Sequence, residues 1–270
     1  MTVHPTAIVE GGASLGAGVE IGPYCLIGPG AVLHDGVRLL SHVVIRGHTE
    51  IGAHTIIHAH AVLGGEAQMH KHNPTGMRLD IGAHNIIREA VTMSTGSAAG
   101  RGITRVGDYG YFMAGSHVAH DCVVGNNVTL SNGVQLAGHV EVGDGVIMGG
   151  LAAIQQFGRI GRYAFVSGVT GVVADVIPYG SAIGTHARLY GLNLVGLRRR
   201  KVPRPNIHAL RAAYRLIFHT GDGTIHENAR LAGEQWPDIP EVLEVVSFIL
   251  ADAKRPICPA RKRGSTDEDE

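Results

Sequence analysis

Residues 3–27, VHPTAIVEGGASLGAGVEIGPYCLI, carry an aliphatic side chain at every sixth position, and the same phase continues without a miss to residue 63. The pattern recurs over residues 81–93 and 106–172, with interruptions at 67–78 and 97–103. Glycine often follows the aliphatic residue directly, and a small or β-branched residue often stands two positions before it. This six-residue repeat decides the fold.

A period of six fits neither the 3.6-residue repeat of an α-helix nor the two-residue alternation of a strand. It fits a triangular coil in which each side is a short strand and each corner is a turn. Three sides make a coil of 18 residues, and successive coils pair as parallel strands about 4.8 Å apart. Glycine and asparagine suit the corners, where a positive φ is expected. We therefore predict a mainly β fold, a parallel β-helix, over residues 1–190.

The composition agrees with a narrow interior. The 270 residues include 39 Gly but only one Trp and five Phe. The 23 Lys+Arg balance the 23 Asp+Glu, which argues against a general nucleic-acid binder, and a hydrophobic content of 44% argues against disorder. Glycine never recurs at every third residue, so a collagen-like chain is excluded.

The hexad pattern stops near Pro178, and the chain beyond residue 203 changes to helical spacing. We predict helices from about 207 to the residues before Gly221, over 224–234 and over 240–253. They form a C-terminal helical domain at 191–253. Residues 254–270 are proline-rich, then basic, then acidic, and are expected to be a disordered tail.

The chain shows no sign of an oxidising compartment or a membrane. Cys25, Cys122 and Cys258 are widely spaced, which supports neither a disulfide framework nor a CxxC metal site. The first residues lack the basic and apolar regions of a signal peptide. No run of 18 apolar residues is present, so no membrane span is expected. We expect a soluble, cytoplasmic protein.

One column of the predicted helix gathers chemically useful groups. Residues 18 apart stack on the same face, so His120, Gly138 and Gln156 form a column outside the inward aliphatic phase. Beside them lie Asp121, His139 and Gln155, with His117 three residues before His120. A neutral histidine can take a proton from a hydroxyl near pH 7, an adjacent aspartate can orient it, and a glycine N–H can stabilise an oxyanion. The column predicts general-base chemistry at His120.

Two other interpretations of the column stay open. The residues can be solvated corners of a solenoid that has no catalytic role. Alternatively, His117, His120 and His139 can bind zinc between neighbouring subunits, as γ-type carbonic anhydrases do with this fold. Those proteins lack the helical C-terminal region expected here.

Two further segments are candidates for binding anions. The first interruption, residues 64–77, contains Lys71, the only lysine before Lys201, and a loop that leaves a regular solenoid often carries function. The run Arg198–Lys201, with Arg204, suits a nucleotide diphosphate or an acidic protein. For both segments, an ordinary solvated surface is the alternative.

Five segments carry a more specific signal. They are GSHVAHDC at 115–122, LAGH at 136–139, QQF at 155–157, IIREAVT at 86–92 and NLVGLRR at 193–199. Together they closely resemble the acyl-[acyl-carrier-protein]–UDP-N-acetylglucosamine O-acyltransferase family, over about residues 1–253. The resemblance implies a left-handed β-helix and a cytoplasmic homotrimer with sites between subunits. It implies transfer of a 3-hydroxyacyl chain from acyl carrier protein to the glucosamine 3-OH of UDP-N-acetylglucosamine, the first step of lipid A synthesis, with no metal or organic cofactor.

The resemblance also implies roles for individual residues. His120 matches the general base, Asp121 its orienting partner and Gly138 the backbone oxyanion donor, in a direct transfer without a covalent acyl-enzyme. Gly168 matches the position that helps to set acyl-chain length. The residues that match substrate contacts are Gln68, Lys71, His117, His139, Gln155, Gln156, Asn193, Arg199 and Arg200. Cys122 falls on the small inward phase and is expected in the core.

Two positions depart from the family pattern. Gln155 stands where the family often has histidine, and Met69 stands where an aspartate often follows the glutamine. Some relatives acylate the 3-amine of a UDP-2,3-diamino sugar and form an amide. Transfer to such an amine is therefore the alternative, with His120 as the base in either case.

Overall fold

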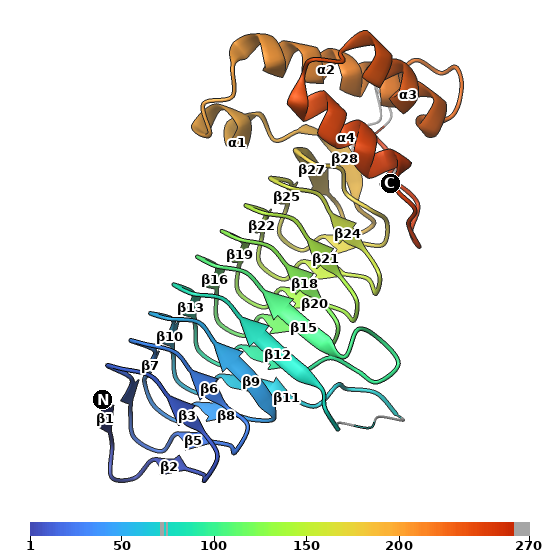
Figure 1. The fold of residues 1–270 in the computed structure, drawn as a ribbon. Coiled ribbons are helices and arrows are strands. Elements are labelled where there is room, and N and C mark those ends of the chain that lie inside the picture. The colour runs from blue at the N-terminus through green and yellow to red at the C-terminus, as the bar shows by residue number, and fades with distance from the viewer. Residues whose placement is uncertain (71–72, 74, 262–270) are drawn as a thin grey trace.

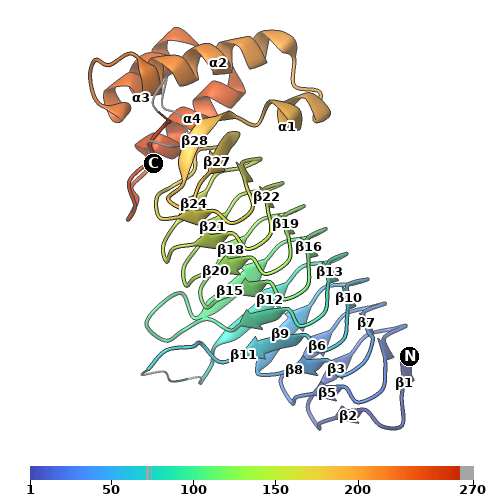
Figure 2. The ribbon, with the colours of Figure 1, turned by 180° about the vertical axis from the view of Figure 1, so that it is seen from behind.

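The hexad frame forms a three-sided prism that rises from the N-terminus to a bundle of helices at the opposite end (Figure 1). This computed structural model describes residues 1–70, 73 and 75–261. Figure 2 shows the same prism from behind, with its short strands stacked coil upon coil. The prediction of a parallel β-helix is confirmed by strand pairing that is parallel throughout the three sheets, except at the last pair.

Each side of the prism is one sheet. The first sheet contains β1 (Thr2–Val3), β4 (Glu20–Ile21), β7 (Arg38–Leu39), β10 (Ile56–Ile57), β13 (Ile86–Ile87), β16 (Tyr111–Phe112), β19 (Thr129–Leu130), β22 (Ile147–Met148), β25 (Phe165–Val166), β27 (Gly180–Ile183) and β28 (Arg188–Leu192). The second sheet contains β2 (Ile8–Val9), β5 (Leu26–Ile27), β8 (Val44–Ile45), β11 (Val62–Gly65), β14 (Thr92–Ser94), β17 (His117–Val118), β20 (Gln135–Leu136), β23 (Ala153–Ile154) and β26 (Gly171–Val172). The third sheet contains β3 (Ser14–Leu15), β6 (Val32–Leu33), β9 (His48–Ile51), β12 (Arg78–Ile81), β15 (Ile103–Val106), β18 (Val123–Val124), β21 (Glu141–Val142) and β24 (Arg159–Ile160).

Two loops leave the prism at the same corner. Partner strands are usually 18 residues apart, as in His117↔Gln135. They are 30 apart in Ile56↔Ile86 and 25 apart in Thr92↔His117, because the chain leaves the coil after β11 and after β14. Both departures lie where the chain turns from the second sheet to the third, which we call the loop corner. The two interruptions of the hexad frame are therefore these two loops.

The interior is the column of single aliphatics that the sequence predicts. From Ile21 onward nearly every on-phase side chain is buried, and Phe112 is the largest fully buried one. Val3, in the first coil, is 40% exposed because no coil lies beneath it. Contacts between stacked coils thus replace the bulky side chains of an ordinary core.

Histidine and tyrosine occupy several corners where glycine or asparagine was expected. Five histidines have a positive φ, among them His54 and His84. The ring of His84 stacks on His54 with centroids 5.2 Å apart and on Tyr109 with centroids 4.9 Å apart. Stacking between successive coils offsets part of the cost of the left-handed backbone. Many of the chain's 17 histidines are accounted for by such corner positions rather than by chemistry.

The helical end contains the three predicted helices and one more. The expected helices are α2 (Arg204–His219), α3 (Ile225–Gln235) and α4 (Pro240–Leu250). Thr224 begins α3 with a capping box in which its side chain and that of Glu227 each bond the other residue's backbone N–H. The helix α1 (Leu194–Arg199) was not predicted. β28 runs across the expected domain boundary at residue 190.

Part of the expected disordered tail is ordered. Asp175 pairs with Ile257 and Leu189 with Ala260, and the Cys258 side chain is fully buried. The prediction is therefore wrong for residues 254–261, because edge backbone at the end of the solenoid offers hydrogen bonds to the passing chain. Residues 262–270 lie outside the described part.

Candidate active site

The predicted column stands at the loop corner, directly after three successive strands of the second sheet. His120 follows β17, Gly138 follows β20 and Gln156 follows β23. The registers His117↔Gln135 and Gln135↔Ala153 hold these coils in phase, so the three residues lie one above the other. The solenoid therefore brings together groups that are 18 residues apart, as predicted.

His120 and Asp121 form a buried pair. The His120 Nδ1 lies 2.8 Å from the Asp121 Oδ2, and the two residues are 7% and 0% exposed. Burial acts to raise the pKa of Asp121, but hydrogen bonds from Ser97 and His120 outweigh it and leave this pKa below its ordinary value. An ionised carboxylate accepts the Nδ1–H and leaves the Nε2 of His120 as the free basic nitrogen. This arrangement suits a general base.

The missing side chain of Gly138 makes room for that imidazole. A Cβ on Gly138 would stand 2.5 Å from the His120 Cε1 and 2.6 Å from its Nε2. Within the described chain, the Gly138 N–H donates to no acceptor. A free backbone donor thus lies beside the basic nitrogen, as an oxyanion site requires.

Two further histidines flank the pair. His117 Nδ1 lies 2.7 Å from the Thr92 Oγ1, and burial lowers the pKa of His117. His139 sits edge-on to His120 with ring centroids 5.2 Å apart, and its Nε2 is 3.6 Å from the Asp121 Oδ2. Burial lowers the pKa of His139 against the attraction of Asp121. Both histidines therefore favour the neutral form and offer hydrogen bonds rather than charge.

A pocket of about 530 Å³ opens over this patch. Of the predicted site residues it is lined by Gln68, His117, His120, Gly138 and Gln156, and also by Met69. Ser94 and Gln135 line it too and were not predicted. Gln135 lies 18 residues after His117, so the column construction would have found it, whereas the second loop displaces Ser94 from the regular spacing.

The remaining candidates lie elsewhere. Gln155 is exposed and does not line the pocket, while Lys71 lies outside the described residues. Gly168 is exposed, and a Cβ there would stand 3.2 Å from the Gly150 carbonyl oxygen. The column is capped by Phe157, whose ring stacks on His139 with centroids 4.6 Å apart and lies 4.0 Å from the Lys254 Nζ.

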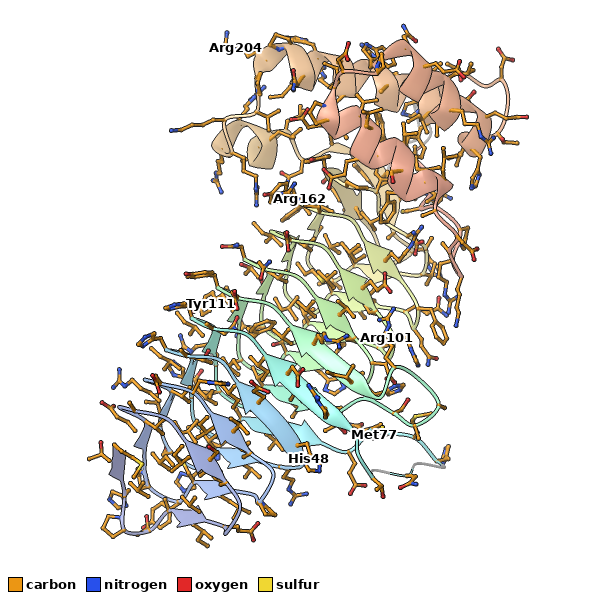
Figure 3. The ribbon with its side chains drawn as sticks, viewed as in Figure 1. His48, Met77, Arg101, Tyr111, Arg162 and Arg204 are labelled. Atoms are coloured by element: carbon orange, nitrogen blue, oxygen red, sulfur yellow. The ribbon has the colours of Figure 1, made fainter. Side chains whose placement is uncertain are left out.

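The predicted nucleotide contacts form a separate group at another corner, where the chain passes from the third sheet to the first. Asn193 begins α1, accepting from the Gly196 N–H and donating to the Tyr163 carbonyl. The Arg200 guanidinium lies 3.8 Å over the Tyr163 ring and donates to the Gly145 carbonyl. Arg199 is exposed. Within one chain these residues do not line the His120 pocket (Figure 3 labels Arg162 and Arg101, which mark the two regions).

The donor set fits a zinc site poorly. In the described part of the chain, the group that could hold a metal is His120, Asp121 and His139, not the three histidines considered from the sequence. The Asp121 oxygens already accept hydrogen bonds from residues 97–102 as well as from His120. Taking a metal there would require breaking these bonds.

A second pocket, of about 480 Å³, lies between α4 and the third sheet. Its Arg159 is paired with the buried Asp175 at 2.6 Å and stacks on Phe248. It therefore reads as a joint between solenoid and helices. Among the described residues, none of the helices has the length and apolar character needed to cross a membrane.

Comparison with known proteins agrees with this site. Residues 175–258 match the family described as UDP N-acetylglucosamine O-acyltransferase, domain 2, and residues 30–65 match bacterial transferase hexapeptide repeats. The chain is 47% identical, over 97% of both chains, to the acyl-[acyl-carrier-protein]–UDP-N-acetylglucosamine O-acyltransferase of Sinorhizobium fredii. It is 49% identical to the Rhizobium johnstonii protein of the same name, over 94% of this chain and 93% of that one.

Solved structures show the same likeness. A crystal structure of a UDP-N-acetylglucosamine acyltransferase superposes with a TM-score of 0.93 at 38% identity, covering 97% of this chain and 100% of that one. The Acinetobacter baumannii structure gives a TM-score of 0.92 at 35% identity, covering 96% and 100%. These matches confirm the left-handed parallel β-helix. The chain belongs to the acyl-[acyl-carrier-protein]–UDP-N-acetylglucosamine O-acyltransferase family.

Proposed function

We propose that the protein transfers a 3-hydroxyacyl chain from acyl carrier protein to the glucosamine 3-OH of UDP-N-acetylglucosamine, the first step of lipid A biosynthesis. The names of the relatives supply the substrates. The observation that carries the proposal to this chain is the buried His120–Asp121 pair, whose free Nε2 lies beside the Gly138 backbone in an open pocket.

The reaction then follows from general acid–base chemistry. The His120 Nε2 removes the proton of the sugar 3-OH as that oxygen attacks the thioester carbonyl. The Gly138 N–H donates to the developing oxyanion. Collapse of the tetrahedral species breaks the carbon–sulfur bond, and the departing thiolate takes the proton back from His120. No acyl-enzyme forms; Cys122 is fully buried and burial raises its pKa to about 12, which leaves its thiol unreactive.

We further propose a cytoplasmic homotrimer with active sites between subunits. The support is the separation of the two groups of predicted residues. In one chain, Asn193, Arg199 and Arg200 lie at a different corner from His120, so a neighbouring copy has to present its cationic corner to the pocket. Gln68, His117, His139 and Gln156 then contact the sugar, with Lys71 and Gln155 nearby, and Gly168 limits the length of the acyl chain.

The experiment that tests the function is an acyl-transfer assay in which UDP-N-acetylglucosamine and its 3-amino analogue are offered side by side. 3-Hydroxyacyl donors of several lengths on acyl carrier protein are compared. We expect the ester product to dominate, because the relatives are named as O-acyltransferases. Preferential formation of the amide would overturn the choice of acceptor, and no transfer to either sugar would overturn the function.

A further inference from the structure

The second loop, which follows β14, wraps around the catalytic aspartate. The Asp121 Oδ1 accepts from the backbone N–H groups of Arg101 at 2.7 Å and Gly102 at 3.1 Å. The Ser97 hydroxyl donates to the Asp121 Oδ2 at 2.5 Å, and the Ser97 N–H lies 3.1 Å from both carboxylate oxygens. The loop thus offers one carboxylate four donors besides His120.

This loop is built as an anion nest. Consecutive N–H groups that converge on one point hold negative charge, and a hydroxyl adds a charge-assisted bond. Ser97 and Asp121 are 1% and 0% exposed, so water does not compete for these bonds. The Asp121 N–H in turn donates to the Thr104 Oγ1 at 2.8 Å, which fixes the backbone of the corner.

Gly100 is required by the closeness of this contact. A Cβ on Gly100 would stand 2.4 to 2.6 Å from the carboxylate atoms of Asp121, and Gly100 is not among the glycines with positive φ. The reason for glycine is therefore space rather than backbone conformation. Only a residue without a side chain lets the loop close over the carboxylate.

The loop also links this carboxylate to the neighbouring coil. The Arg101 guanidinium donates to the Asp121 carbonyl at 3.1 Å and forms an ion pair with Glu141 (Arg101 is labelled in Figure 3). The nest is thereby fastened at both ends, to the coil of Asp121 and to the coil above it. A carboxylate held by four donors has one orientation, and in that orientation its Oδ2 meets the His120 Nδ1.

We propose that residues 97–102 are a positioning device, in which Ser97 and Gly100 orient the Asp121 carboxylate so that His120 carries its proton on Nδ1 and keeps Nε2 free. Ser97 and Gly100 touch neither the pocket nor any reacting atom, so they are positioning residues rather than catalytic ones. The inference rests on the proposed function in one respect, that His120 is the base.

The test compares Ser97→Ala, Ser97→Thr and Gly100→Ala with the unsubstituted protein. Thr55→Val is the matched control, because the Thr55 hydroxyl is also fully buried and hydrogen-bonded but belongs to another corner. Two quantities are measured. Nitrogen-15 NMR of labelled histidines reports which ring nitrogen of His120 is protonated, with His120→Gln identifying the signal. Steady-state kinetics separate kcat from KM.

We expect the Nδ1–H form in the unsubstituted protein and a mixture of tautomers in Ser97→Ala. The kcat of Ser97→Ala should fall about tenfold, because a bond to a charged group is lost, with KM within about twofold. Ser97→Thr keeps the hydroxyl and should restore most of the kcat. Gly100→Ala should lower kcat at least as far, and Thr55→Val should affect stability but neither tautomer nor kcat.

An unchanged tautomer and an unchanged kcat in Ser97→Ala would overturn the positioning role. A loss of activity in Ser97→Ala that Thr55→Val shares, with the His120 tautomer unchanged, would reduce the nest to a purely structural stitch and overturn it as well. The tautomer measurement needs no substrate. A failure of the proposed acyl transfer, seen as an inactive unsubstituted protein, is therefore distinguishable from a failure of this inference.

Discussion

Replacing Gly138 by alanine places one methyl group against the catalytic imidazole. The Cβ would stand 2.5 Å from the His120 Cε1 and 2.6 Å from its Nε2, whereas ordinary contacts begin at 3.4 Å. Gly138 is not among the residues with positive φ, so alanine fits its backbone. The perturbation is therefore steric and local.

The expected magnitude follows from the displacement. Relief of the contact requires the ring to move by about 0.9 Å, and the 2.8 Å bond between the His120 Nδ1 and Asp121 does not survive such a shift in good geometry. A misplacement of about 1 Å costs on the order of 100-fold in rate, which is about 2.7 kcal/mol of transition-state stabilisation. We expect kcat/KM for Gly138→Ala to fall by about that factor.

The assay is steady-state acyl transfer to UDP-N-acetylglucosamine, with the thermal midpoint of unfolding measured in parallel. Gly11→Ala is the control, because a Cβ at Gly11 meets nothing within 4 Å and its φ is not positive. Its kcat/KM should stay within about twofold of the unsubstituted protein. A Gly138→Ala enzyme with similar kcat/KM would refute the placement of His120 over Gly138.

Three further predictions concern the scaffold and the substrate. Asn85→Leu should lower the free energy of unfolding in urea by about 3 kcal/mol, because the buried Asn85 amide bonds the backbone of Gly82, Gly107 and Gly110; a loss below about 1 kcal/mol would contradict this reading. Burial lowers the folded pKa values of His117 and His139, so the unfolded chain takes up their protons first as the pH falls below about 6.5. Stability should therefore decrease towards about pH 5.5, and less steeply in His139→Gln; an equal slope in that variant would exclude His139 as a source. Gly168→Met should shift the preference to shorter acyl donors, and an unchanged chain-length profile would remove Gly168 from the acyl site.

The repeating part of the fold could be predicted from the sequence because each coil repeats one physical requirement. An aliphatic side chain must point inward on every side of the prism, so the phase from Val3 to Val172 encodes strands, core and register together. The same spacing placed His120 above Gly138 and Gln156. A site that consists of stacked equivalents is visible to periodicity.

Features that depend on non-repeating contacts were not visible. The six-residue helix α1 contains Gly196 and is too short to show an amphipathic pattern. The segment around Cys258 has the prolines and charges of a disordered tail, yet it pairs with the edge of the solenoid at Asp175. The nest around Asp121 needs the closed loop before Ser97 and Gly100 acquire a role.

The central claim is that His120 is the general base for acyl transfer. The direct measurement is kcat/KM of His120→Ala, with acyl carrier protein bearing a 3-hydroxyacyl chain and with UDP-N-acetylglucosamine, in a preparation shown to have the same oligomeric state as the unsubstituted protein. General-base catalysis contributes on the order of 100- to 10,000-fold. The account predicts a loss of about 1,000-fold with assembly intact. A His120→Ala enzyme that turns over within about tenfold of the unsubstituted protein would contradict it.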